Sequence, residues 1–211
     1  MNRRNHMTKQ IVKLIVLCIA VTTLLSACST TQKITPSART ATEQLLITES
    51  VLRSLPKERD MPFPIPRGSK VKLEVAGISA DKDLVKSVVA GWLGMHGYIP
   101  QDEGASHRIN IVVNSLGTEL ATTFFGIPPI NGALIPIATP ELAFYKSESQ
   151  LGYSRFHFDI FEIPSGKFLA SSSPFLSDTF YNTYVLLFLF KFNKTDLINP
   201  PEVKSFTQLV K

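Results

Sequence analysis

Along the chain, the spacing of apolar residues first indicates a helix directly after a polar stretch. Thr40 and Glu43 have the spacing of a capping box, in which each side chain binds the backbone N–H of the other residue at a helix N-terminus. Apolar residues then recur at helical spacing, and Pro56 cannot continue a helix. We therefore predict a helix over residues 40–54 with an apolar stripe made of Leu45, Leu46, Val51, Leu52 and Leu55.

The next part of the chain predicts a strand, a second helix and another strand. Residues 71–75 alternate apolar and polar side chains, which is typical of a half-buried strand. Residues 81–97 have apolar residues at helical spacing and end in a glycine, which suits a helix C-terminus. Residues 108–115 alternate again and place three apolar side chains on one face: Ile109, Ile111 and Val113.

Strand patterns dominate the C-terminal half. Residues 153–163 alternate, and a Pro-Ser-Gly turn separates them from residues 167–171, which predicts a hairpin. Residues 181–192 are apolar and aromatic throughout. Their β-branched and aromatic content favours a strand, with a helix as the alternative. Residues 199–211 have the pattern of a loosely attached tail.

This order of elements predicts the α+β class. Because strands that come as hairpins leave helices able to share one face, we expect a two-layer sandwich of a mostly antiparallel sheet with two helices. We expect it to form a single domain over residues 40–198, after a polar, Ser/Thr-rich tether over residues 28–39.

A long uncharged segment interrupts the pattern over residues 120–144. From Ala121 to Pro140 there are 20 residues without a charge, but four prolines exclude a membrane-spanning helix. One interpretation is a long loop folded over the domain. The other is an exposed apolar lobe that contacts lipid or a protein partner, because long loops and exposed apolar patches tend to be functional. Its contact residues would be Phe124, Phe125, Ile127 and Ile130.

The N-terminal residues 1–27 have the pattern of a secretory signal. A basic region is followed by an apolar stretch and then by small residues. The uncharged run over residues 14–27 is 14 residues long, whereas a spanning helix needs about 20. The chain has a formal net charge of +5, and residues 1–27 hold four basic and no acidic residues, so the remainder is nearly neutral at +1. That remainder has no charge pattern for nucleic-acid binding.

The residues after position 27 offer little catalytic chemistry. The chain lacks a Gly-rich phosphate loop, a Gly-x-Ser-x-Gly motif and a His-Glu-x-x-His motif. Its histidines have no metal-ligand spacing, and we expect no metal site and no cofactor. His157 and Asp159 share one strand face and could meet His107, but solvated surface positions explain them better. The composition favours a non-catalytic protein over an enzyme.

The end of the signal, Leu25-Ser26-Ala27-Cys28, resembles the lipobox of bacterial lipoproteins. The resemblance implies cleavage between Ala27 and Cys28, followed by diacylation of the Cys28 sulfur and N-acylation. Two or three acyl chains, palmitate for example, hold a protein firmly to a bilayer. Ser29 follows, and in enterobacteria-like sorting this implies the outer membrane. Cys18 would leave with the signal, so the mature chain would have no free thiol.

Several phrases together resemble a family of bacterial outer-membrane lipoproteins of unknown function. The similarity covers most of residues 40–197 and implies location and fold, but no chemistry. More loosely, the chain is similar to small lipoprotein subunits of envelope assembly machines. The phrases are Thr40-Ala-Thr-Glu-Gln-Leu-Leu46, Leu116-Gly-Thr118, Phe125-Gly-Ile-Pro128, Pro140-Glu-Leu-Ala143 and Lys194-Thr-Asp-Leu197.

We therefore expect a lipid-anchored lipoprotein of the outer membrane that faces the periplasm and acts as a binding or assembly component. Its partners would be the membrane, through the acyl chains, and another envelope protein or a second copy of itself. One alternative is a periplasmic enzyme whose site residues lie too far apart in the sequence to be recognised as a motif. The other is a carrier of a hydrophobic ligand.

Overall fold

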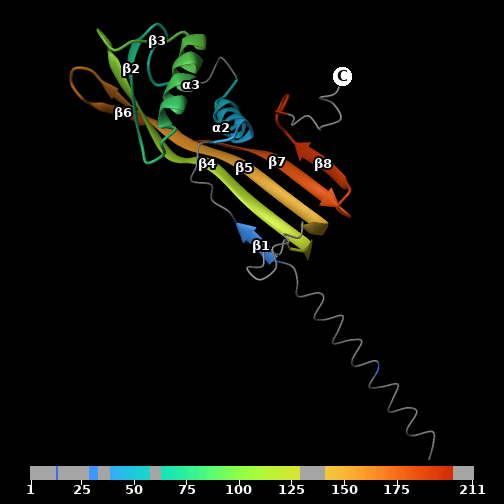
Figure 1. The fold of residues 1–211 in the computed structure, drawn as a ribbon. Coiled ribbons are helices and arrows are strands. Elements are labelled where there is room, and N and C mark those ends of the chain that lie inside the picture. The colour runs from blue at the N-terminus through green and yellow to red at the C-terminus, as the bar shows by residue number, and fades with distance from the viewer. Residues whose placement is uncertain (1–12, 14–28, 33–38, 58–62, 129–140, 202–211) are drawn as a thin grey trace, which may run out of the picture. The chain divides into compact units, whose positions relative to one another are not determined.

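The computed structural model describes Lys13 and residues 29–32, 39–57, 63–128 and 141–201 (Figure 1). Over these residues the chain forms two helices, and its strands belong to one sheet. In chain order, the elements are β1 (Ser29–Gln32), α2 (Ala41–Ser54), β2 (Lys70–Gly77), α3 (Lys82–Met95), β3 (Ile99–Pro100), β4 (His107–Ile127), β5 (Leu142–Glu162), β6 (Phe168–Ser171), β7 (Phe175–Leu186) and β8 (Phe190–Thr195).

The strands pair in the order β3-β2-β4-β5-β7-β8, while β1 pairs with β4 and β6 pairs with β5. β1–β4 and β5–β6 are antiparallel pairs. β2, however, runs parallel to both β3 and β4, within a sheet that we expected to be mostly antiparallel. The reason is the crossover: α3 connects β2 to β4, and a helical connection returns the chain to run in the same direction. The α+β class is confirmed.

The predicted capping box opens α2. The Thr40 backbone N–H donates to Glu43 Oε2 at 2.7 Å, and the Glu43 N–H donates to Thr40 Oγ1 at 3.2 Å. The helix ends at Ser54, with the extended Leu55 as its C-cap directly before Pro56. Local sequence therefore sets both ends of this helix, as predicted.

Both helices and the inner faces of three predicted strands supply one hydrophobic core. The alternation predicted for residues 108–115 and 153–163 is confirmed, because every second side chain there is buried. Two residues of the stripe predicted for α2 are not fully buried: Leu52 is 47% exposed, and Leu45 is half-buried. The core includes Ile47, Val51, Leu55, Val71, Leu73, Val85, Val89, Trp92, Leu93, Ile109, Ile111, Val113, Phe156, Phe158, Ile160 and Phe175.

The chain divides into two compact units. The first, which we call the strand unit, comprises residues 1–32, 121–148 and 183–192; its described residues are 13, 29–32, 121–128, 141–148 and 183–192. The second, the helix-covered unit, comprises residues 33–120, 149–182 and 193–211 and contains α2, α3 and the core. β4, β5, β7 and β8 each contribute residues to both units.

The prediction of a loop over residues 120–144 is wrong for its described parts. β4 continues to Ile127, and β5 begins at Leu142. The Thr-Thr-Phe-Phe run at 122–125 has high strand propensity, and a proline follows β4 directly, where its missing N–H breaks no ladder. Residues 129–140 lie outside the described residues.

Two other segments differ from prediction in detail. Residues 181–192 are strands, as favoured, but a turn over 187–189 divides them between β7 and β8. In the predicted tether, residues 29–32 form β1, which pairs with β4 in the strand unit. Apart from Lys13, the signal residues lie outside the described residues, as does most of the predicted tail (202–211).

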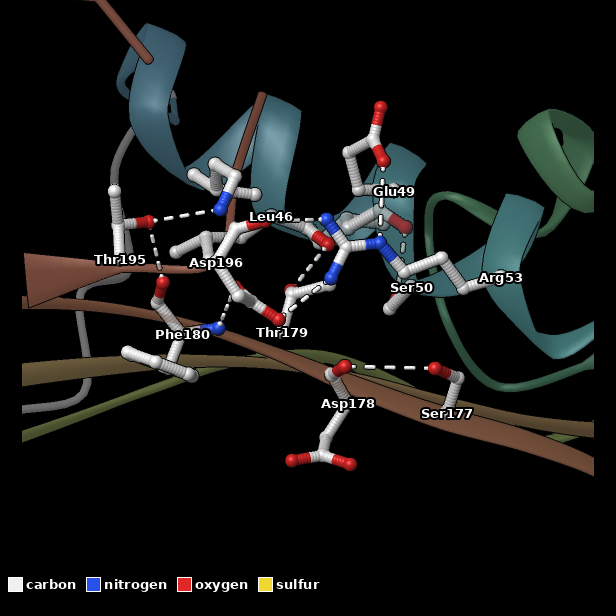
Figure 2. Close-up of polar contacts among 12 residues, drawn as sticks. Leu46, Glu49, Ser50, Arg53, Ser177, Asp178, Thr179, Phe180, Thr195 and Asp196 are labelled. Atoms are coloured by element: carbon white, nitrogen blue, oxygen red, sulfur yellow. Dashed lines mark hydrogen bonds and ion pairs between the residues drawn. The ribbon is translucent and has the colours of Figure 1, made fainter. Parts of the chain in front are cut away.

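Polar contacts in the helix-covered unit join α2 to β7 and to the end of β8 (Figure 2). Asp196 Oδ1 accepts a hydrogen bond from the Phe180 N–H at 2.8 Å, and Asp196 Oδ2 lies 2.5 Å from Nη1 of Arg53 on α2. The Asp196 carbonyl accepts a second bond from Arg53 Nη2 at 2.8 Å, and Thr195 Oγ1 donates to the Phe180 carbonyl at 2.6 Å. Because Phe180 and Asp196 flank residues 183–192 in the chain, this cluster fastens both ends of that segment.

Small residues allow α2 to lie close to β5 and β7. A Cβ at Gly152 would lie 2.7 Å from the backbone carbon and oxygen of Leu46. The buried Thr179 donates its hydroxyl to the Leu46 carbonyl at 2.8 Å, and Ser154 beside them is also fully buried. Helix and sheet therefore approach through backbone atoms here.

Candidate functional site

The strand unit exposes most of its large apolar side chains. The core cluster of the protein consists of residues of the helix-covered unit. Contiguous exposed apolar surface on a globular protein usually marks an interaction site. The exposed side chains are Phe125, Ile127, Leu142, Phe144, Tyr145, Leu186, Leu187, Phe188, Leu189, Phe190 and Phe192.

The ends of β4 and β5 approach each other closely in this unit. A Cβ at Gly126 would meet the Leu142 carbonyl oxygen and lie 2.9 Å from the Ala143 Cα, so only glycine fits there. Phe125 and Phe144 lie with ring centroids 6.1 Å apart, and Phe125 is 39% exposed. Glycine thus brings two strands together while the neighbouring aromatic rings stay on the surface.

The turn between β7 and β8 presents five consecutive apolar side chains to solvent. Leu187, Phe188 and Leu189 are 56%, 54% and 73% exposed, and Leu186 and Phe190 beside them are exposed as well. Leu187 and Phe188 have φ values of 46° and 51°, a left-handed conformation that is rare for bulky residues and costs of order 1 kcal/mol each. Strained backbone and exposed apolar side chains therefore coincide at this turn.

The backbone of the turn is nevertheless hydrogen-bonded. The Leu187 N–H donates to the Phe144 carbonyl at 2.9 Å, and the Phe188 N–H donates to the Ala143 carbonyl at 2.8 Å. The Leu189 N–H donates to the Leu186 carbonyl at 3.2 Å. The side chains of the turn are therefore exposed, while three of its backbone N–H groups are hydrogen-bonded to carbonyls of the protein.

Three charged groups of the strand unit form a compact cluster on β5 and just before it. Lys146 Nζ lies 3.1 Å from Oε1 of Glu141 and 3.1 Å from Oε1 of Glu148. Burial lowers the pKa of Lys146, but hydrogen bonds and charge from Glu148 and Glu141 outweigh it, so the pKa lies above its ordinary value. These three side chains are therefore paired with one another within the unit.

Two of the four contact residues predicted from the sequence are exposed. Phe125 and Ile127 are 39% and 47% exposed, whereas Phe124 is half-buried. Ile130 lies outside the described residues, as do Ala27 and Cys28.

Sequence reasoning missed the β7–β8 turn, because residues 186–190 contain no glycine, proline, asparagine or aspartate that marks a turn. The length of the apolar run over residues 181–192 could have indicated the turn, because this run is longer than a single strand of average length.

The titratable residues considered for catalysis do not assemble into a site. His157 Nδ1 lies 3.0 Å from Asn114 Oδ1, and His157 Nε2 lies 3.9 Å from Asp159 Oδ2. Asn114 is seven residues beyond His107 on β4, roughly 23 Å along a strand, so His107 does not reach this pair. Among the described residues, no group of three or more His, Cys, Asp or Glu could hold a metal ion.

The helix-covered unit contains an apolar cleft of about 520 Å³. Phe63 and Pro64 of the connector before β2 form part of its wall. β5, β6, β7 and the segment between β6 and β7 form the rest, through Ile160, Ala170, Ser171, Ser172, Ser173 and Phe175. The volume is that of a small-ligand site.

Comparison with known protein families and with curated proteins finds no match. In the described part of the chain, no helix combines the length and the apolar character needed to cross a membrane.

Proposed function

We propose that this protein is a lipid-anchored lipoprotein of the bacterial outer membrane, facing the periplasm, and that it acts there as a non-catalytic binding or assembly component. Support for the anchor comes from the sequence: a basic and apolar signal segment ends in Leu25-Ser26-Ala27-Cys28, and Ser29 follows. The family resemblance carried by residues 40–197 agrees with this location.

The observation that carries the binding role is the exposed apolar surface of the strand unit. The core of the helix-covered unit contains none of these exposed residues. That core therefore does not need them for its packing. Exposed aromatic and aliphatic side chains that serve no internal packing are the usual anchors of an interface. The strand unit is therefore the binding surface of the protein.

For the helix-covered unit we further propose the two-layer form of the α+β fold, a sheet covered on one face by α2 and α3. The support is that buried side chains of the helices and alternate side chains of β2, β4 and β5 belong to one cluster.

Mass spectrometry of the N-terminal peptide tests the anchor. We expect an acylated Cys28 at position one of the mature chain, and recovery of the protein with outer-membrane vesicles. An unmodified N-terminus, or a protein found in the cytosolic fraction, would refute the proposal.

A comparison of paired variants tests the binding role. Phe125→Ser/Ile127→Ser removes two exposed side chains of the strand unit, and Phe168→Ser/Leu176→Ser removes two from the helix-covered unit that are 53% and 57% exposed. After gentle detergent extraction, we expect the wild type and the control pair to migrate in one assembly and the strand-unit pair in a smaller species. Identical migration of all three contradicts the role of the strand unit.

A second candidate function, carriage of a hydrophobic ligand, is favoured by the 520 Å³ cleft. Ala170→Phe would fill this cleft, because Ala170 forms part of its wall. A carrier would then lose binding of a fluorescent fatty acid that the wild type binds. If the wild type itself binds no such probe, the carrier function is rejected.

A further inference from the structure

The β7–β8 turn has the character of a segment that enters lipid. Five consecutive apolar side chains, Leu186 to Phe190, are all exposed at the turn, so no alternate position along it is buried. A protein partner would need a deep pocket to cover such a tip, whereas the hydrocarbon of a bilayer surrounds it without any matching shape. The turn retains its large side chains although its left-handed backbone favours glycine.

Entry into hydrocarbon also requires that backbone polar groups be satisfied by protein, because no water is present there. The N–H groups of Leu187 and Phe188 meet this requirement through the carbonyls of Phe144 and Ala143 on β5. The same two bonds hold the tip against the neighbouring strand. These two N–H groups therefore do not need water as hydrogen-bond partner when the turn enters lipid.

The register of β1 indicates which surface lies beside the strand unit. β1 pairs with β4 antiparallel, with Ser29 opposite Phe124. Cys28 directly precedes Ser29, and consecutive Cα atoms lie about 3.8 Å apart. An acylated Cys28 therefore places the membrane surface within one residue of a strand of this unit.

The residues that flank the turn suit the boundary between hydrocarbon and headgroups. Lys191 follows the turn and is exposed, and a lysine can extend its charge to lipid phosphates while its stem stays apolar. The Tyr184 and Phe192 rings stack with centroids 5.1 Å apart, and aromatic rings are enriched at this depth of a membrane.

We propose that the β7–β8 turn is a second, non-covalent membrane contact, which inserts Leu186–Phe190 into the leaflet that holds the acyl chains of Cys28. This inference rests on the proposed function, because the acylated Cys28 brings the bilayer to the strand unit. Its consequence is that the strand unit is held against the membrane at two points, the acyl chains and the turn. The protein would then have a fixed orientation on the surface instead of rotating about a single anchor.

A single fluorescent label tests the insertion. The acylated chain has no free thiol, so Leu189→Cys provides one site in the turn and Ile78→Cys provides a control site, fully exposed, in the helix-covered unit. The full-length protein is purified from membranes, labelled with a polarity-sensitive fluorophore, and reconstituted in phosphatidylethanolamine and phosphatidylglycerol vesicles with or without brominated acyl chains.

We expect brominated lipid to reduce the fluorescence at position 189 by about twofold or more, with little change at position 78. Equal quenching at the two positions overturns the inference. A blue-shifted label at 189 that brominated lipid does not quench also overturns it, because a second copy or another protein then covers the turn. A label at Phe188→Cys repeats the test at a neighbouring position.

Mass spectrometry of the same preparation separates the two proposals. Acylated Cys28 together with an unquenched label at position 189 refutes the insertion and leaves the lipoprotein assignment intact. An unmodified Cys28 refutes the lipoprotein assignment whatever the label shows.

Discussion

The contact between Asp196 and α2 allows us to predict how much unfolding free energy is lost when the ends of residues 183–192 are no longer held. Asp196→Ala removes the acceptor of the Phe180 N–H bond, worth about 1 kcal/mol, and the ionic partner of Arg53. Both charged side chains are 28% exposed, so solvent screens the pair, and we assign it about 0.5–1 kcal/mol. The bond from Arg53 to the Asp196 backbone carbonyl survives the substitution. The expected loss is therefore about 2 kcal/mol of unfolding free energy.

Asp196→Asn separates the two contributions, because an amide oxygen still accepts the Phe180 N–H while the charge is lost. We expect this variant to lose about 0.5–1 kcal/mol only. Asp178→Ala is the matched control. Asp178 lies on β7, as Phe180 does, but its carboxylate points away from the cluster (Figure 2), so the substitution should change stability by less than about 0.5 kcal/mol.

Urea unfolding of the detergent-solubilised chain measures these losses. Trp92 is the one tryptophan of the sequence and is 5% exposed in the core, so its emission reports unfolding of the helix-covered unit. If Asp196→Ala unfolds like the control, the cluster does not fasten this segment. If Asp196→Asn loses as much as Asp196→Ala, the charge pair dominates and our division of the energy is wrong.

Three further predictions concern packing, pH and the strand unit. Gly152→Ala should lower the free energy of unfolding in urea by about 2–3 kcal/mol, because the new Cβ would meet rigid helix backbone. Gly117→Ala is the control, since it has open space around it and should lose little. Equal losses in the two variants would contradict the close approach of α2 to β5. Burial raises the pKa of Tyr98 although Arg67 lowers it, so the contribution of Tyr98 to the unfolding free energy should be constant below its unfolded-state pKa and should be lost as the pH rises through the higher folded-state pKa. Tyr98→Phe should flatten this alkaline decline, and an unchanged decline would show that another group titrates. Gly126→Ala should separate β4 from β5 and speed hydrogen exchange of the Leu187 and Phe188 amides, with exchange near Trp92 unchanged.

What the sequence determined by itself is local. The capping box of α2, the apolar stripe of α3 and the alternation of residues 108–115 and 153–163 each depend on neighbours within a few positions, and the structure confirms them. The signal segment and lipobox are equally local patterns, and they remain the basis of the proposed location.

The tertiary structure alone decided how these elements combine. Residues 120–127 form a strand rather than a loop because they lie against β5. Gly126 permits this close approach to Leu142 and Ala143, and no local pattern in the sequence reveals that contact. The turn at 187–189 has no turn residues and is held by carbonyls of β5, about 40 positions away. Strand pairing and exposure arise between segments distant in the chain, so a pattern can predict that a residue is apolar but not whether anything covers it.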